Sequence, residues 1–116
     1  MIFQNELAAK VLRGEKTVTR RLTSPNPSSP WFEGECQFGP GSLAAVQMGR
    51  GKPAIGRIRI TDVRLEALLG VDDDEARLEG FPSAAAFVEA WTQINGTYDA
   101  EAAVWRLEFE LADDQR

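Results

Sequence analysis

The chain has 116 residues, of which 43% are hydrophobic, and a formal net charge of −5, with no histidine and a single cysteine. This length fits one domain with a single core, so we expect residues 1–116 to form one domain. The composition excludes internal disulfides, histidine-based catalytic dyads and a structural zinc site, so we expect no metal and no cofactor.

Membrane and export signals are missing from the sequence. No apolar run approaches the length of a membrane span, and residues 1–6 have neither a basic n-region nor an apolar h-region. We therefore expect a cytoplasmic protein with no membrane partner. Charge is uneven, because residues 10–64 hold ten Lys or Arg against four Asp or Glu, and residues 65–116 hold three against thirteen. The net charge argues against general affinity for long nucleic acid, but the first half can present a basic surface.

The first predicted element is a helix over residues 6–13. Asn5 suits the N-cap, apolar residues recur every four positions from Phe3 to Val11, and Gly14 suits the position that ends the helix. The β-branched residues that follow predict a strand directly after this helix.

That strand covers residues 16–22 and contains the densest group of reactive side chains. In a straight strand Lys16 and Thr19 would face opposite sides, so for them to converge Lys16 must lie in the turn before the strand or on a bulge. The alternative is a solvated turn lysine beside a threonine that only favours the strand.

Residues 23–34 contain three prolines and should form a long irregular loop. Within it, Trp31 either stacks on a planar base at a pocket mouth or anchors the loop to the domain, and anchoring is the favoured interpretation. Short strands are predicted at residues 36–38 and 43–48, with a tight turn at residues 39–41 between them.

The loop at residues 49–53 contains two glycines and two cations, Arg50 and Lys52. It either binds a phosphate or is a soluble hairpin tip. Residues 55–65 form the longest strand pattern, with Ile58 and Ile60 facing inward. The apolar positions then change from even to odd at residues 63 and 65, which predicts a bulge near residues 61–62 that keeps both sets buried.

Four acidic residues at 72–75 fit a helix start better than a metal site. Asp72 suits the N-cap and Glu75 suits the third position of a capping box. This short helix ends at Glu79, where the helix dipole disfavours an anion, so Glu79 has either a functional role or an arginine partner.

Ser83 is expected to cap a second helix that runs to residue 95, with Phe87, Trp91 and Ile94 on one face. The last strand alternates cleanly. We expect residues 105, 107, 109 and 111 to face inward, residues 106, 108 and 110 to face outward, and residues 113–116 to fray.

The segment from Gly14 to Arg21 has the pattern Gly-x-Lys-Thr-x-Thr-x-Arg after a short N-terminal helix. This pattern resembles the opening motif of the ASCH domain, a small barrel related to the PUA RNA-binding fold. Glu79-Gly80-Phe81 and the strand at residues 104–109 resemble the second half of that family in order and spacing. The resemblance implies an α+β fold with a small, mainly antiparallel β-barrel flanked by helices.

Members of the ASCH family are linked to RNA and modified nucleosides, and some small bacterial members resemble amidohydrolases that deacetylate N4-acetylcytidine. The resemblance implies a catalytic set of Lys16, Thr19 and Glu79. Thr19 would attack the amide, Lys16 would accept its proton or stabilise the oxyanion, and Glu79 would pass a proton to the leaving amine. Lys16 could act as a base only if burial or neighbouring cations lower its pKa. Candidate contacts to the substrate or to nucleic acid are Thr17, Arg20, Arg21, Trp31, Arg50 and Lys52.

Other functions remain open. The same cleft could bind RNA or a modified base without chemistry, or belong to a metal-independent ribonuclease, or the acidic second half could bind another protein. The proline-rich loop and the 49–53 loop depart from the small amidohydrolases and can reshape the pocket.

Overall fold

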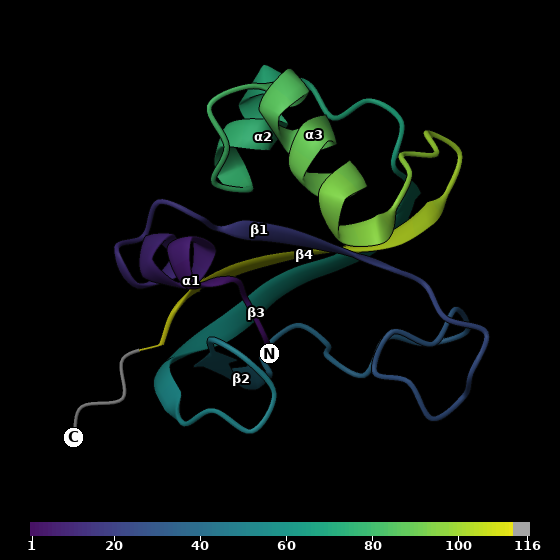
Figure 1. Ribbon diagram of the computed structural model, residues 1–116. Helices are drawn as coiled ribbons and strands as arrows, with labels where there is room; N and C mark the ends of the chain where they lie inside the picture. Colours follow the sequence, from purple (N-terminus) through teal and green to yellow (C-terminus); the bar gives the residue numbers. More distant parts are fainter. Residues whose placement is uncertain (113–116) are drawn as a thin grey trace.

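The computed structural model describes residues 1–112, and its centre is a four-stranded antiparallel sheet. The sheet curls into a half-barrel in the strand order β1-β4-β3-β2, so that β1 and β2 form its two edges (Figure 1). This arrangement confirms the α+β class with antiparallel strands. The strands are β1 (Val18–Leu22), β2 (Leu43–Gln47), β3 (Ala54–Ala67) and β4 (Ala103–Leu111).

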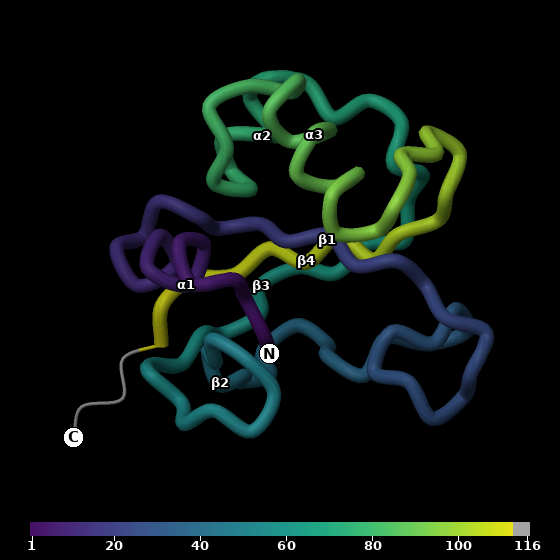
Figure 2. The backbone as a smooth tube through the Cα atoms, in the orientation of Figure 1, coloured from purple at the N-terminus to yellow at the C-terminus, as the bar shows by residue number. Residues whose placement is uncertain are grey.

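Helices cover both faces of this sheet. The tube in Figure 2 shows α2 (Asp73–Leu78) and α3 (Ala84–Asn95) together on one side, whereas α1 (Asn5–Leu12) lies on the other. No helix within residues 1–112 is long and apolar enough to cross a membrane.

Each face has its own apolar core. Beneath α1, the helix contributes Ala8 and Val11, which pack on strand residues. On the opposite face, α2 and α3 pack against the ends of β3 and β4. The α1 core contains Phe3, Ala8, Val11, Ala44, Val46, Ile58, Ile60, Leu107 and Phe109, and the second core contains Leu68, Ala76, Phe87, Trp91 and Val104.

Residues 1–3 connect the two edges of the half-barrel. Phe3 N donates to Gln47 O at 2.9 Å, which attaches this segment to β2. Arg21, which extends from β1, donates from Nη2 to Ile2 O at 2.9 Å. Residues 1–3 therefore bridge the opening of the curled sheet. Their backbone bonds to β2, and the Arg21 side chain bonds to them from β1.

The last strand corrects one prediction with consequences for the site. Leu107 and Phe109 face the α1 core as expected, and the opposite face carries Arg106. We expected Arg106 to be exposed, but only 4% of its surface is accessible. The predicted alternation along β4 is confirmed. The predicted exposure of Arg106 is wrong, because α2 and α3 cover that face of the sheet. Leu111, predicted to face inward, is exposed where β4 leaves the core.

The long strand bends where its pattern changes. Its register with β4 shifts between Ile60 and Asp62, which confirms the predicted bulge. The bulge does not bury both sets of apolar residues, since Leu65 remains 53% exposed. Ile94 of α3, expected on the buried face with Trp91, is also exposed.

Some predicted helices and strands differ from the structure in smaller ways. The first helix begins at Asn5 itself, with Gln4 at the N-cap and no side-chain capping bond. Residues 36–38, predicted as a strand, have no regular structure, while residues 23–34 form an irregular loop as expected. The frayed end expected at residues 113–116 lies outside the described residues.

Candidate active site beside the edge strand

The turn between α1 and β1 places Lys16 inside the protein. Gly14 adopts a positive φ of 77°, a backbone conformation that glycine tolerates best, and the chain reverses there. Lys16 then precedes β1, as predicted, and only 2% of its surface is exposed. The alternative of a solvated turn lysine is therefore wrong.

The ammonium group of Lys16 has three acceptors. Its Nζ lies 2.7 Å from Val18 O, 2.8 Å from Glu79 O and 3.0 Å from Glu79 Oε1. Burial lowers the pKa of Lys16, the Glu79 carboxylate opposes that change, and the nearby Arg21 and Arg20 add to it. The sequence analysis required burial or neighbouring cations to lower this pKa, and both are present.

Glu79 occupies the C-cap of α2 and is 3% exposed. Its Oε2 accepts from Arg20 Nη1 at 3.0 Å, and its Oε1 accepts from Lys16. The two cations compensate for the unfavourable position of a carboxylate at a helix C-terminus. Each carboxylate oxygen of Glu79 is thus fixed by a different cation.

Arg20 and Arg106 lie directly opposite each other in the register of β1 and β4. Like charges at such positions repel. Glu75 lies between them, with Oε1 2.9 Å from Arg106 Nε and in contact with Arg20 Nη2. Glu66 also approaches Arg20, at 3.4 Å. The two arginines are therefore held side by side by carboxylates.

Sequence reasoning missed the roles of Glu75 and Arg106. Asp72 does cap α2, since its Oδ1 accepts from Glu75 N at 2.9 Å. The Glu75 side chain, however, turns toward the arginines. The hydrogen bond from Arg106 is the main cause that holds its pKa below the ordinary value; burial opposes this change, and Arg20 adds to it. The only signal in the sequence was an arginine in each of two predicted strands, Arg20 and Arg106.

Glu75→Gln is expected to lower the free energy of unfolding by about 1–3 kcal/mol near neutral pH, the cost of weakening charge-assisted hydrogen bonds. Because the pKa of Glu75 is lowered in the folded state, its stabilisation is present above the ordinary value of 4.5 and is lost as the pH falls through the folded pKa. Urea unfolding from neutral to acid pH should show the two proteins converging below this value. Glu89→Gln, on the exposed face of α3, is the matched control, and parallel curves for Glu75→Gln would contradict the assignment.

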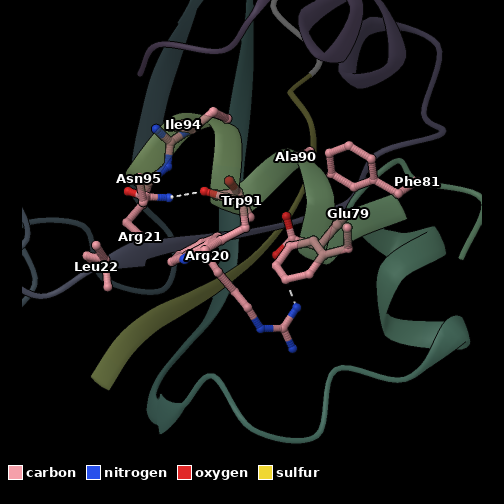
Figure 3. A pocket seen from close by; sticks show the side chains of 11 residues that line it. Arg20, Arg21, Leu22, Glu79, Phe81, Ala90, Trp91, Ile94 and Asn95 are labelled. Atoms are coloured by element: carbon pink, nitrogen blue, oxygen red, sulfur yellow. Dashed lines mark hydrogen bonds and ion pairs between the residues drawn. The ribbon is translucent and has the colours of Figure 1, made fainter. Parts of the chain in front are cut away.

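A pocket of about 180 Å³ lies between β1 and α3 (Figure 3). Thr19 and Glu79 are among its polar lining residues, and Phe81, Phe87 and Trp91 form an aromatic wall. Figure 3 shows Glu79 beside Arg20. Thr19 is 4% exposed, and its hydroxyl makes no hydrogen bond with any residue in the described part of the chain. The pocket is therefore lined by a threonine, a glutamate and an apolar surface.

The three predicted catalytic residues are near one another but not equivalent. Thr19 and Glu79 line the pocket, whereas Lys16 lies behind Glu79 and is not part of the lining. Arg20 and Arg21 also line the pocket. The sequence did not identify the aromatic wall as part of a site, because Phe87 and Trp91 read as core residues.

The remaining predicted contacts lie elsewhere. Trp31 packs against Phe38 with ring centroids 5.5 Å apart, and the Arg21 guanidinium lies 5.6 Å from the Trp31 ring, so Trp31 anchors its loop and does not line the pocket. Thr17 joins neighbouring segments through its backbone, since its N donates to Leu78 O at 2.9 Å.

The 49–53 loop is remote from the pocket. Arg50 and Lys52 are exposed at the turn between β2 and β3, across the sheet from α2 and α3 (Figure 1). Within residues 1–112 no group of three His, Cys, Asp or Glu is arranged to hold a metal ion.

The curled sheet, flanking helices and buried motif define an ASCH-type α+β domain. The chain is similar to the ASCH domain from Lactobacillus crispatus JV V101, with a TM-score of 0.72 and 27% identity over 92% of this chain and 70% of that one. It is also similar to a protein of the DUF984 family from Enterococcus faecalis V583, with a TM-score of 0.63 and 21% identity over 93% and 68% of the two chains.

A third solved structure, a mutant ASCH protein from Zymomonas mobilis, has a TM-score of 0.57 and 14% identity over 95% of this chain and 66% of that one. At the two lower identities the likeness shows the fold alone. No family model and no curated protein sequence matches the chain. The ASCH resemblance seen in the sequence motifs is confirmed by these structures.

Proposed function

We propose that the protein is an amidohydrolase that removes the acyl group from N4-acylated cytidine, free or within RNA. The observation that carries the proposal is that Thr19 and Glu79 line one pocket while Lys16 and Arg20 fix the two oxygens of Glu79. A threonine and an oriented carboxylate that line one pocket supply a nucleophile and a candidate general base. The ASCH resemblance supports the choice of substrate.

The shape of the pocket supports a small planar ligand. At about 180 Å³ it is smaller than the sites of roughly 300–1,000 Å³ that hold drug-sized molecules. The aromatic wall of Phe81, Phe87 and Trp91 suits a pyrimidine ring. We expect the base and its acyl group to occupy the pocket, with the ribose outside.

The proposed reaction has two steps. Thr19 Oγ1 attacks the amide carbon and gives its proton to Glu79, which returns it to the N4 nitrogen as the carbon–nitrogen bond breaks and cytidine leaves. Glu79 then deprotonates a water molecule that attacks the acyl-threonine ester, and it returns this proton to the departing Thr19 oxygen as a carboxylic acid is released. Glu79 ends the cycle as it began.

Lys16 has a supporting role in this proposal. Burial lowers the pKa of Lys16, but all three of its acceptors favour the protonated amine. We assign it the role of a cation that holds Glu79 and stabilises negative charge nearby, and not that of the base.

One observation favours a second function, a module that binds a modified base without chemistry. Both oxygens of the Glu79 carboxylate are already engaged, one by Lys16 and the other by Arg20. In that case the pocket would still recognise the base.

Purified protein incubated with N4-acetylcytidine is expected to release cytidine and acetate, followed by absorbance and chromatography. N4-methylcytidine is the control, because it carries a substituent on the same nitrogen but no amide to hydrolyse. A thermal shift with N4-acetylcytidine but no product over several acyl groups would favour the binding module. Neither binding nor turnover would contradict both functions.

A further inference from the structure

Arg20 is the middle member of a chain of ion pairs that begins at the pocket and ends in the sheet. Its side chain is 2% exposed and carries carboxylates on both terminal nitrogens. Nη1 lies 3.0 Å from Glu79 Oε2, and Nη2 contacts Glu75 and, at 3.4 Å, Glu66. The guanidinium therefore has partners beyond the residue that faces the pocket.

Glu75 anchors this arrangement. It receives two bonds from Arg106, Nε to Oε1 at 2.9 Å and Nη2 to Oε2 at 3.3 Å. Arg106 belongs to β4, which pairs with a strand on each side and is thus a rigid base. Glu75 and Glu79 are four residues apart at one side of α2, so that both carboxylates reach the same arginine. The bonds from Arg20 to these two carboxylates therefore fix α2 and Arg20 relative to each other.

We propose that Arg20, anchored by Glu75 and Arg106, is a positioning residue that sets the direction of the Glu79 carboxylate in the pocket that Thr19 also lines. This inference rests on the proposed amidohydrolase function. Lys16 holds one oxygen of Glu79 and Arg20 holds the other, so a rotation of the carboxylate breaks one of two buried bonds. Precise orientation of a general base is a large part of its catalytic effect.

The anchors also explain how the site stays in place during a reaction. When Glu79 takes the proton of Thr19, it no longer compensates the charge of Arg20. Arg20 still has Glu75 and Glu66, so the guanidinium does not have to move. Glu79 can change its protonation state while its neighbour remains fixed.

The test uses Glu75→Ala in the full chain, because Glu75 does not line the pocket. We expect kcat for N4-acetylcytidine to fall by about 10- to 100-fold with KM little changed, the result of a misplaced base with intact binding. Asp74→Ala is the control, since it removes an exposed ion pair with Arg77 from the same helix and should leave kcat unchanged. Circular dichroism at the assay temperature establishes that each variant is folded.

A double variant separates positioning from general destabilisation. In a Glu79→Gln background there is no base left to orient, so Glu75→Ala should cause no further loss of the residual rate. A purely structural role would lower the rate equally in both backgrounds and would overturn the proposal. If Glu75→Ala does not fold, Glu75→Gln is judged by the same two measurements.

The outcomes distinguish the two proposals. A wild-type protein without turnover overturns the amidohydrolase function and the positioning role with it. An active wild type whose Glu75→Ala variant matches Asp74→Ala overturns the positioning role alone. A higher KM with unchanged kcat would make Arg20 a binding contact and would also overturn it.

Discussion

Thr19→Val is expected to lower kcat for N4-acetylcytidine by about 1,000-fold or more, because it removes the nucleophile of the proposed reaction. Valine keeps the β-branched shape that suits β1. The Thr19 hydroxyl makes no hydrogen bond within residues 1–112, so we expect a change of less than about 1 kcal/mol in the free energy of unfolding. Thr19→Val should therefore lose activity while its free energy of unfolding stays nearly that of the wild type.

Two further variants make this prediction specific. Thr61→Val is the control, since Thr61 is an exposed threonine of β3 and its loss should leave kcat unchanged. Combining Thr19→Val with Glu79→Gln should lose no more activity than the worse single variant, because residues that act as one unit are not additive. If instead both singles weaken ligand binding in modest additive steps, the pocket recognises a base and does not hydrolyse it.

Glu79→Ala is expected to cause the largest loss of stability, about 3–5 kcal/mol, because it leaves a buried lysine without its carboxylate. Lys16 is 2% exposed and would retain only carbonyl acceptors. Lys16→Met should cost less, since Glu79 keeps its bond to Arg20 and methionine replaces the apolar stem. Urea unfolding of both variants measures this order, and an equal or reversed order would contradict the assignment.

The pH dependence of Glu79→Ala provides a check on the same idea. The pKa of Lys16 is lowered by burial, and Glu79 opposes this, so the variant should lower that pKa further. Between the folded pKa and the ordinary value of 10.5, the unfolded state holds more protons, and stability rises with pH. The deficit of Glu79→Ala relative to wild type should therefore shrink as the pH rises toward the ordinary lysine value of 10.5. A deficit that is constant or grows would show that another loss dominates.

Local structure was predictable where the cause lies within a few residues. Asp72 and Ser83 cap α2 and α3 as expected, because a short polar side chain satisfies a free amide of the first turn. Gly96 ends α3 with a φ of 83°, which glycine adopts without strain. The change of apolar positions from even to odd likewise indicated the bulge in β3.

The sequence proposed the members of the candidate site, and it indicated their geometry only in part. The motif and the ASCH resemblance identified Lys16, Thr19 and Glu79, and the unfavourable helix position of Glu79 indicated an arginine partner. The identity of that partner, Arg20, depends on a contact between residues 59 positions apart. No local pattern encodes such a contact.

The sequence by itself determined the class of fold, the caps of α2 and α3 and the bulge in β3, and it proposed the three motif residues, because each follows from short-range patterns of side chains or from the motif itself. Only the tertiary structure decided that Arg106 is buried and that Glu75 bridges it to Arg20. Alternation along a strand separates its two faces but does not say which face a helix will cover. The packing of α2 and α3 against β1 and β4 decides which face is covered. As a result Arg106, expected at the surface, and Glu75, expected only to cap a helix, support the site.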